Sequence, residues 1–263
     1  MYDFAYHKPA SVADAVKLLG ADGEAKPLAG GQTLIPTLKQ RLARPSAVVD
    51  LGAIKDLAGI SVAGGKVTIG AMTKHADVAA SADVKKAIPA LAALAGGIGD
   101  PAVRHRGTIG GSIANNDPAA DYPAACLALG ATIKTNKREI AADDFFRGMF
   151  ETALDAGELI VSVSFPVAEK AAYQKFDQPA SRYALVGVFV AKTASGVRVA
   201  VTGAAASVFR WKEAEAALSK NFAAAALDGV KASANGLNSD IHGSAEYRAH
   251  LIGVMAKRAV AAA

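Results

Sequence analysis

Two pairs of adjacent glycines, Gly30-Gly31 and Gly110-Gly111, are the residues of this sequence best suited to holding a ligand. Small hydroxyl residues lie beside each pair, Thr33 near the first and Thr108 and Ser112 near the second. Because glycine has no Cβ, such turns let successive backbone N–H groups approach an anion, and the hydroxyls add donors. We therefore expect the two turns to hold a diphosphate, the alternative being that each pair forms only a tight turn.

Other chemistries have weaker support in the sequence. No segment reads G-x-x-x-x-G-K-[ST], and the glycines of 96–111 do not form G-x-G-x-x-G, which disfavours a P-loop or Rossmann site. His242, Glu246 and His250 share a spacing of four, but the two imidazoles are too far apart to hold one ion easily, which favours a solvated helix face. No serine lies in G-x-S-x-G, and Cys126 is typical of a small core residue.

Composition excludes several classes of protein. The 263 residues include 29 Lys and Arg against 24 Asp and Glu, a net charge of +5, and the basic residues are scattered rather than clustered, which argues against nucleic-acid binding. A single cysteine cannot form an internal disulfide or a metal cluster. No apolar run reaches the roughly 18–20 residues of a membrane span, and the N-terminus lacks the order of a signal peptide, so we expect a cytoplasmic protein without a membrane span.

The first fifth of the chain predicts a small unit with a crossover helix. Ser11 followed by Asp14 resembles a capping box before a short amphipathic helix. A strand, the first glycine turn and a helix over 34–42 follow, and 47–51 is a short apolar strand. These elements predict a subdomain that ends near residue 52.

The next part predicts a hairpin, helices and a final strand. Gly64-Gly65 supplies the positive φ values of a tight hairpin. Helical periodicity runs over 76–95 with Pro89 inside it, and a helix over 124–129 begins at either Asp117-Pro118 or Tyr122-Pro123. An alternating strand then ends at Pro166.

The pattern of the sequence changes near residue 172, where a second domain is expected to begin. Apolar strands are expected over 184–191 and 197–202, and helices over 211–218, 222–232 and 245–262. This order predicts a two-layer domain with helices on one face of an antiparallel sheet.

Five segments resemble motifs of a known family. Residues 29–36 are similar to its A-G-G-[QH]-[ST]-L-x-P turn, and residues 108–121 are similar to its T-I-G-G-x-x-A…D-P-x-x-D segment. The segments 67–73, 145–148 and 245–248 also fit. The chain thereby resembles, over essentially its whole length, the FAD-binding medium subunit of molybdenum hydroxylases of the carbon monoxide dehydrogenase and xanthine dehydrogenase type.

The resemblance implies a set of FAD contacts. The two glycine turns would hold the diphosphate between them, and Asn115 and Asp121 match positions near the ribityl, ribose or phosphate groups. Ile160 matches an apolar residue that contacts the cofactor, and Lys175 matches a lysine near the isoalloxazine. Tyr183 matches the residue that covers one face of the flavin ring. The alternative for Tyr183 is a strand residue packed in the core. The implied cofactor-binding residues are Leu28, Ala29, Gly30, Gly31, Gln32, Thr33, Thr108, Ile109, Gly110, Gly111, Ser112, Asn115, Asp121, Ile160, Lys175 and Tyr183. No catalytic residue and no metal ligand is expected.

The resemblance also implies an α+β fold. A FAD-binding region of the vanillyl-alcohol-oxidase-like (PCMH) type would occupy residues 1–171, with subdomains over about 1–52 and 53–171. A C-terminal α/β two-layer sandwich of the carbon monoxide dehydrogenase flavoprotein type would follow over 172–263. Some relatives carry a cysteine-rich insertion for an iron–sulfur cluster, and the single Cys126 indicates that this chain has none.

The function implied is that of a FAD-binding electron-transfer subunit in a heterotrimeric molybdenum hydroxylase, arranged as a dimer of heterotrimers. Electrons from a molybdenum cofactor on a large subunit would cross [2Fe-2S] clusters on a small subunit, reach FAD here and pass to NAD, a quinone or oxygen. One alternative is a stand-alone flavin oxidoreductase acting on a small alcohol or sugar, which would need a base beside the flavin, and the sequence places no histidine there. Another is a non-catalytic nucleotide-binding or assembly protein.

Overall fold

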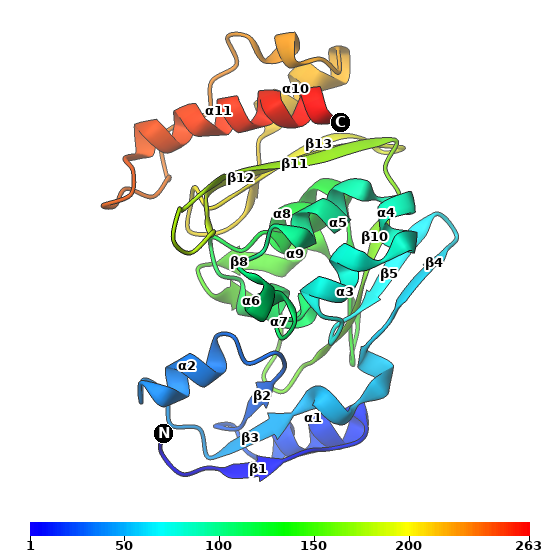
Figure 1. Cartoon of the computed structure of the whole chain (residues 1–263), viewed down its shortest axis with the longest axis vertical. Helices are drawn as coiled ribbons and strands as arrows, with labels where there is room; N and C mark the ends of the chain where they lie inside the picture. The colour runs from blue at the N-terminus through cyan, green and yellow to red at the C-terminus, as the bar shows by residue number, and fades with distance from the viewer.

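The computed structural model describes residues 1–263 and arranges them in three tiers along the long axis of the molecule (Figure 1). The N-terminal tier is a parallel sheet in the order β1-β3-β2 with two helices. Ser11 accepts the N–H of Asp14 and caps the first helix, as the capping-box pattern predicts. The elements are β1 (Ala5–His7), α1 (Val12–Ala21), β2 (Lys26–Leu28), α2 (Leu34–Lys39), β3 (Ala47–Asp50), η1 (Leu51–Ala53) and η2 (Lys55–Leu57).

The middle tier is an antiparallel sheet in the order β4-β5-β10-β6-β7, covered by helices. Gly64 and Gly65 take φ values of +57° and +71° in the predicted hairpin. Its strands are β4 (Ile60–Ala63), β5 (Lys66–Gly70), β6 (Thr132–Thr135), β7 (Glu139–Ala141) and β10 (Ile160–Pro166), with a separate hairpin of β8 (Phe146–Gly148) and β9 (Glu151–Thr152). Its helices are α3 (His75–Ala80), α4 (Ala82–Ala87), α5 (Pro89–Gly96), α6 (Pro101–Arg104), α7 (Ile109–Asn115), α8 (Tyr122–Leu129) and α9 (Ala142–Phe145).

The helix boundaries in the middle tier refine two predictions made from the sequence. The single helical run predicted over 76–95 is three helices, because Ser81 caps α4 and Pro89 begins α5. The helix around 124–129 begins at Tyr122-Pro123 rather than at Asp117-Pro118. The side chain of Asp117 instead accepts the N–H of Ala119 in a turn.

The C-terminal tier is an antiparallel sheet in the order β11-β12-β13-β14 with helices at its outer face. Its elements are β11 (Lys170–Asp177), β12 (Ala184–Thr193), β13 (Gly196–Thr202), β14 (Phe209–Arg210), α10 (Lys212–Lys220), η3 (Ala224–Leu227) and α11 (Ala245–Ala262). No helix of the chain has the length and apolar character that crossing a membrane requires.

Helices cover both faces of the C-terminal sheet. Figure 1 shows α11 above β11–β13 and α5 and α8 below them. Val188 and Val190 pack in the core that includes α11, whereas Phe189 and Ala191 pack in the core of the middle tier. The sequence predicts helices on one face of this sheet, and helices of the middle tier cover its other face. Residues on both faces of β12 are therefore buried almost continuously. This packing fixes the start of β12 against the middle tier.

Candidate functional site

A cavity of about 630 Å³ lies where the three tiers meet. The first glycine turn lines it from the N-terminal tier, α7 and the start of β10 line it from the middle tier, and residues 181–183 line it from the loop before β12. Segments that are far apart in the sequence thus line one space. Cavities of this size and mixed lining are typical of cofactor sites.

The first glycine turn presents a run of free donors to this cavity. The backbone N–H groups of residues 29–33 donate to no acceptor within the chain. Gly31 has a φ of +75°, a value that favours glycine, at the bend of this run. Because consecutive unpaired amides form an anion-binding concavity, the turn between β2 and α2 is suited to phosphate oxygens.

The second glycine pair differs from the prediction. It is not a turn after a strand but the first turn of α7, with Thr108 as the N-cap. The N–H of Gly110 donates to the carbonyl oxygen of Ala71 at 2.8 Å, and the N–H of Gly111 donates to the Thr108 hydroxyl at 3.1 Å. These amides are therefore used within the protein, and the second pair contributes a rigid wall rather than a row of free donors.

The glycines of both segments are required by close packing. A Cβ on Gly30 would overlap the carbonyl oxygen of Arg106 and lie 2.7 Å from the Cα of Gly107. A Cβ on Gly110 would lie 2.7 Å from the carbonyl oxygen of Ala71. The first turn thus rests directly on the segment that leads into α7, and larger residues would separate the two walls of the cavity.

Most of the predicted site residues line this one cavity. Those that do are Ala29, Gly30, Gly31, Gln32, Thr33, Thr108, Gly110, Gly111, Ser112, Asn115, Asp121, Ile160 and Tyr183. Leu28, Ile109 and Lys175 do not. The Leu28 side chain lies beneath Gly31, Ile109 is fully buried in the core, and Lys175 lies behind Asp121.

Several polar side chains at the cavity have no partner within the chain, among them Thr33, Ser112 and Asn115. The hydroxyls of Thr33 and Ser112 and the side-chain amide of Asn115 make no hydrogen bond to protein atoms. Each can therefore donate to a bound ligand without breaking an existing contact.

A buried acid stands at the edge of the cavity next to α8. The hydroxyl of Tyr173 donates to Asp121 at 2.5 Å, and the ammonium of Lys175 lies 3.2 Å from the same carboxylate. Burial raises the pKa of Asp121, and Lys175 and Tyr173 oppose that effect. The two partners keep this acid in one orientation and offset its charge beside the cavity.

His75 is a cavity residue that sequence analysis missed. It begins α3, its ring lies 5.4 Å from that of Tyr122, and Gly107 leaves room for it, since a Cβ there would lie 2.6 Å from Nε2. Burial, with the charge of Arg104, lowers the pKa of His75 to about 4. Its Nδ1 is buried and has no partner. No spacing signal in the sequence distinguishes it from the other histidines.

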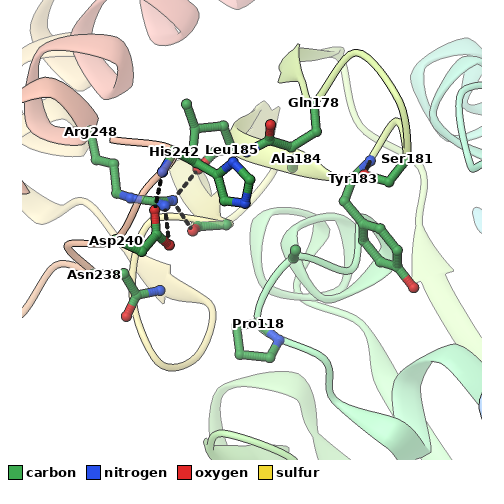
Figure 2. A pocket seen from close by; sticks show the side chains of 12 residues that line it. Pro118, Gln178, Ser181, Tyr183, Ala184, Leu185, Asn238, Asp240, His242 and Arg248 are labelled. Atoms are coloured by element: carbon green, nitrogen blue, oxygen red, sulfur yellow. Dashed lines mark hydrogen bonds and ion pairs between the residues drawn. The ribbon is translucent and has the colours of Figure 1, made fainter. Parts of the chain in front are cut away.

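Tyr183 occupies the loop between β11 and β12 and is half exposed. Burial raises the pKa of its hydroxyl, and the nearby carboxylates of Asp117 and Asp121 add to this. The ring lines the cavity, and Figure 2 shows that it points away from the cluster around Arg248. Its position suits an aromatic side chain that packs on a planar ligand.

The donor set and shape fit FAD. Five unpaired amides at residues 29–33 suit a diphosphate, and the free hydroxyl and amide groups of Thr33, Ser112 and Asn115 suit ribityl and ribose oxygens. Apolar side chains such as Ile160 and Met72 and the ring of Tyr183 suit an isoalloxazine. When bound, FAD supplies the redox chemistry, and the chain supplies binding and orientation.

Known proteins match the chain over its full length. Residues 2–168 match the FAD binding domain in molybdopterin dehydrogenase, and residues 171–263 match the CO dehydrogenase flavoprotein C-terminal domain. The nicotine 6-hydroxylase medium subunit of Paenarthrobacter nicotinovorans is 38% identical and aligns over 97% of this chain and 95% of its own. The carbon monoxide dehydrogenase medium chain of Hydrogenophaga pseudoflava is 37% identical over 99% of this chain and 96% of its own.

A solved structure agrees with these matches. Reconstituted CO dehydrogenase from Oligotropha carboxidovorans superposes with a TM-score of 0.91 at 37% identity, covering 99% of this chain and 97% of that one. The predicted α+β fold and the predicted resemblance are thus confirmed. The chain belongs to the FAD-binding medium subunits of the molybdenum hydroxylase family, and it is a subunit of an oxidoreductase.

Proposed function

We propose that this chain passes electrons from the iron–sulfur clusters of a partner subunit, through FAD bound in the cavity of about 630 Å³, to an external acceptor. The run of unpaired amides at residues 29–33 is the observation that carries the proposal, because it is a ready-made diphosphate site at one end of that cavity. The clusters and a molybdenum cofactor would be held by a small and a large subunit, in a dimer of heterotrimers. NAD, a quinone or oxygen would be the acceptor.

The site residues divide into three roles in this proposal. Residues 29–33 donate backbone N–H groups to the diphosphate, and the Thr33 and Ser112 hydroxyls add donors at its sides. Asn115 and the anchored Asp121 bind ribityl or ribose oxygens. Tyr183 covers one face of the isoalloxazine and excludes water from it.

The same contacts support a division of the chain near residues 52 and 171. Along the sequence, β3 is the last strand of the parallel sheet, β4 is the first strand of the middle sheet, and β11 is the first strand of the C-terminal sheet. Each unit contributes one wall of the cavity, so the cofactor would bind where the three units join.

The geometry favours electron transfer over direct oxidation of an alcohol or sugar. Sequence analysis expects no histidine beside the flavin, yet His75 lines the cavity. A general base is most effective when its pKa lies near the operating pH, whereas burial lowers the pKa of His75 to about 4. His75 is therefore suited to accepting or donating a hydrogen bond as a neutral group rather than to removing a substrate proton.

Anaerobic flavin reduction tests this function. We expect the full chain with FAD to keep its oxidised absorbance when mixed with alcohols, sugars, aldehydes, purines or CO. The native complex, isolated through a tag on this chain, should contain molybdenum and iron, and its flavin should bleach with the substrate of the complex. Rapid bleaching of the isolated chain by any of these compounds would support the stand-alone oxidoreductase instead.

A further inference from the structure

The loop that carries Tyr183 is not held by a packed core on its outer side. A second cavity, of about 250 Å³, lies between this loop and residues 238–242, and Figure 2 shows Gln178, Ser181 and His242 around it. Apolar packing fixes a side chain only where neighbouring atoms fill the space around it. The position of Tyr183 must therefore depend on polar contacts to the backbone of its loop.

One such contact comes from Lys175 on the inner side. Its side chain is only 8% exposed, and its ammonium donates to the carbonyl oxygens of Arg182 at 2.8 Å and Gly97 at 3.0 Å, besides its ion pair with Asp121. Arg182 directly precedes Tyr183 and has a φ of +59°. A non-glycine residue in this left-handed region is strained and persists only where surrounding contacts fix it. Lys175 supplies such a contact.

The matching contact on the other side comes from Arg248 of α11. Its side chain is 4% exposed, and its Nη1 donates to the carbonyl oxygens of Leu185 and Gly203 at 2.9 Å each. Its Nη2 donates to Asp240 at 2.7 Å, which keeps the side chain extended, as Figure 2 shows. Leu185 lies two residues after Tyr183, so buried cations bind the backbone on both sides of this tyrosine.

The same two cations connect the loop to the opposite wall of the cofactor cavity. The N–H of Gly203 donates to the carbonyl oxygen of Pro118 at 2.8 Å, and the hydroxyl of Thr202 donates to that of Ala120 at 2.7 Å. Arg248 therefore reaches residues 117–121 through Gly203, and Lys175 reaches them through Asp121. Lys175, through the residue before Tyr183, and Arg248, through a residue after it, therefore both fix the distance between Tyr183 and residues 117–121.

We propose that Arg248 and Lys175 are positioning residues that hold Tyr183 against the bound cofactor by fixing the backbone carbonyls on either side of it. The proposal rests on the proposed function, because it takes FAD as the occupant of the larger cavity. Neither side chain needs to touch the cofactor. Arg248 acts from a helix of the C-terminal tier that contributes no residue to that cavity.

The test uses Arg248→Gln in the full chain with bound FAD. Removing the guanidinium leaves the Leu185 and Gly203 carbonyls without their donor, whereas Asp240 is exposed enough to be solvated. We expect Kd for FAD to rise about fivefold, which is about 1 kcal/mol and the scale of one aromatic stacking contact. The fluorescence of the bound flavin should rise, since a stacked tyrosine that quenches it is displaced.

A matched control comes from the same sheet. Arg210 in β14 makes a two-point ion pair with Glu215, at 2.7 and 2.8 Å, and lies at the edge of the sheet away from Tyr183. Arg210→Gln should lower Tm as Arg248→Gln does but leave Kd and flavin fluorescence unchanged. A general loss of stability would affect both variants alike.

A double-mutant cycle with Tyr183→Ala separates an effect through the tyrosine from a general one. If Arg248 acts through Tyr183, Arg248→Gln should change neither Kd nor fluorescence further in the Tyr183→Ala background. An equal effect in both backgrounds, or no effect in the wild-type background, would overturn the proposal while FAD binding itself stayed intact. If Arg248→Gln does not yield folded protein, Arg248→Lys, which keeps the charge but loses the planar guanidinium that bonds Leu185, Gly203 and Asp240 together, enters the same cycle with the same criteria. A wild-type chain that binds no FAD would instead refute the proposed function.

Discussion

The contact between the first glycine turn and the segment leading into α7 makes Gly30→Ala a sharp perturbation of the cofactor cavity. The new Cβ would overlap the Arg106 carbonyl oxygen and lie 2.7 Å from the Cα of Gly107, where ordinary contact begins at 3.4 Å. The two segments must therefore separate by at least 0.7 Å to relieve the Gly107 contact, and further to clear the Arg106 oxygen; overpacking of this kind costs about 1–3 kcal/mol of stability.

The same shift should weaken FAD binding. A displacement of this size in the run of amides at residues 29–33 should lengthen or break one hydrogen bond to a phosphate, and hydrogen bonds to charged groups contribute about 1.5–3 kcal/mol. We therefore expect Kd for FAD to rise roughly 10- to 100-fold. Fluorescence titration of the full chain measures Kd, and thermal unfolding in the absence of FAD measures the cost to the fold.

Gly20→Ala is the matched control in the same tier. Gly20 lies in α1, and a Cβ added there would have no atom within 4 Å, so alanine should add about 0.5–1 kcal/mol of stability and leave Kd unchanged. Wild-type FAD affinity in Gly30→Ala would refute the reasoning, because it would mean that the contact between these segments does not shape the cofactor site.

The cavity makes three other residues testable. Tyr183→Ala should raise the fluorescence of bound flavin and shift its midpoint potential, whereas Val190→Ala, in the core against α11, should lower Tm without altering the flavin spectrum. Thr33→Val should weaken FAD binding about tenfold with little change in Tm, because the hydroxyl has no partner within the chain; an unchanged Kd would remove Thr33 from the site. Burial lowers the pKa of His75 from 6.5 to about 4, so between these pH values only the unfolded chain binds a proton at this residue. The free energy of unfolding should therefore be unaffected above pH 6.5 and should fall as the pH drops toward 4. The expected loss at pH 5 is about 2 kcal/mol. Urea unfolding at pH 7 and pH 5 should show that loss in the wild type and not in His75→Gln; equal losses would contradict the buried neutral imidazole.

Local patterns were sufficient to predict several elements and the first glycine turn, but β6, β7 and β11 were not predicted, and the helix expected over 222–232 was wrong, because only the short η3 forms there. Ser11 caps α1, Gly64-Gly65 forms a hairpin, and β2, the turn and α2 follow one another as expected, because each depends on residues close together in the sequence. The family motifs then predicted which segments would meet, and most of the residues named from them line one cavity.

The parts that the sequence did not predict depend on contacts between distant segments. Gly110-Gly111 has the same local signal as the first pair, but an acceptor at Ala71, far away in the sequence, converts it into the start of a helix. His75 enters the cavity wall because Gly107 leaves space for its ring. Lys175 pairs with Asp121, more than fifty residues away, so its burial behind the cavity cannot be read from the pattern of β11.

Titration of the purified full chain with FAD and with riboflavin tests the central claim most directly, which is that the amides of residues 29–33 hold the diphosphate of one FAD. We predict saturation at one FAD per chain, and a Kd for riboflavin weaker by about 100-fold or more, because riboflavin lacks the phosphates and forgoes at least two hydrogen bonds to charged oxygens. Riboflavin binding as tight as that of FAD would show that these amides do not hold the diphosphate.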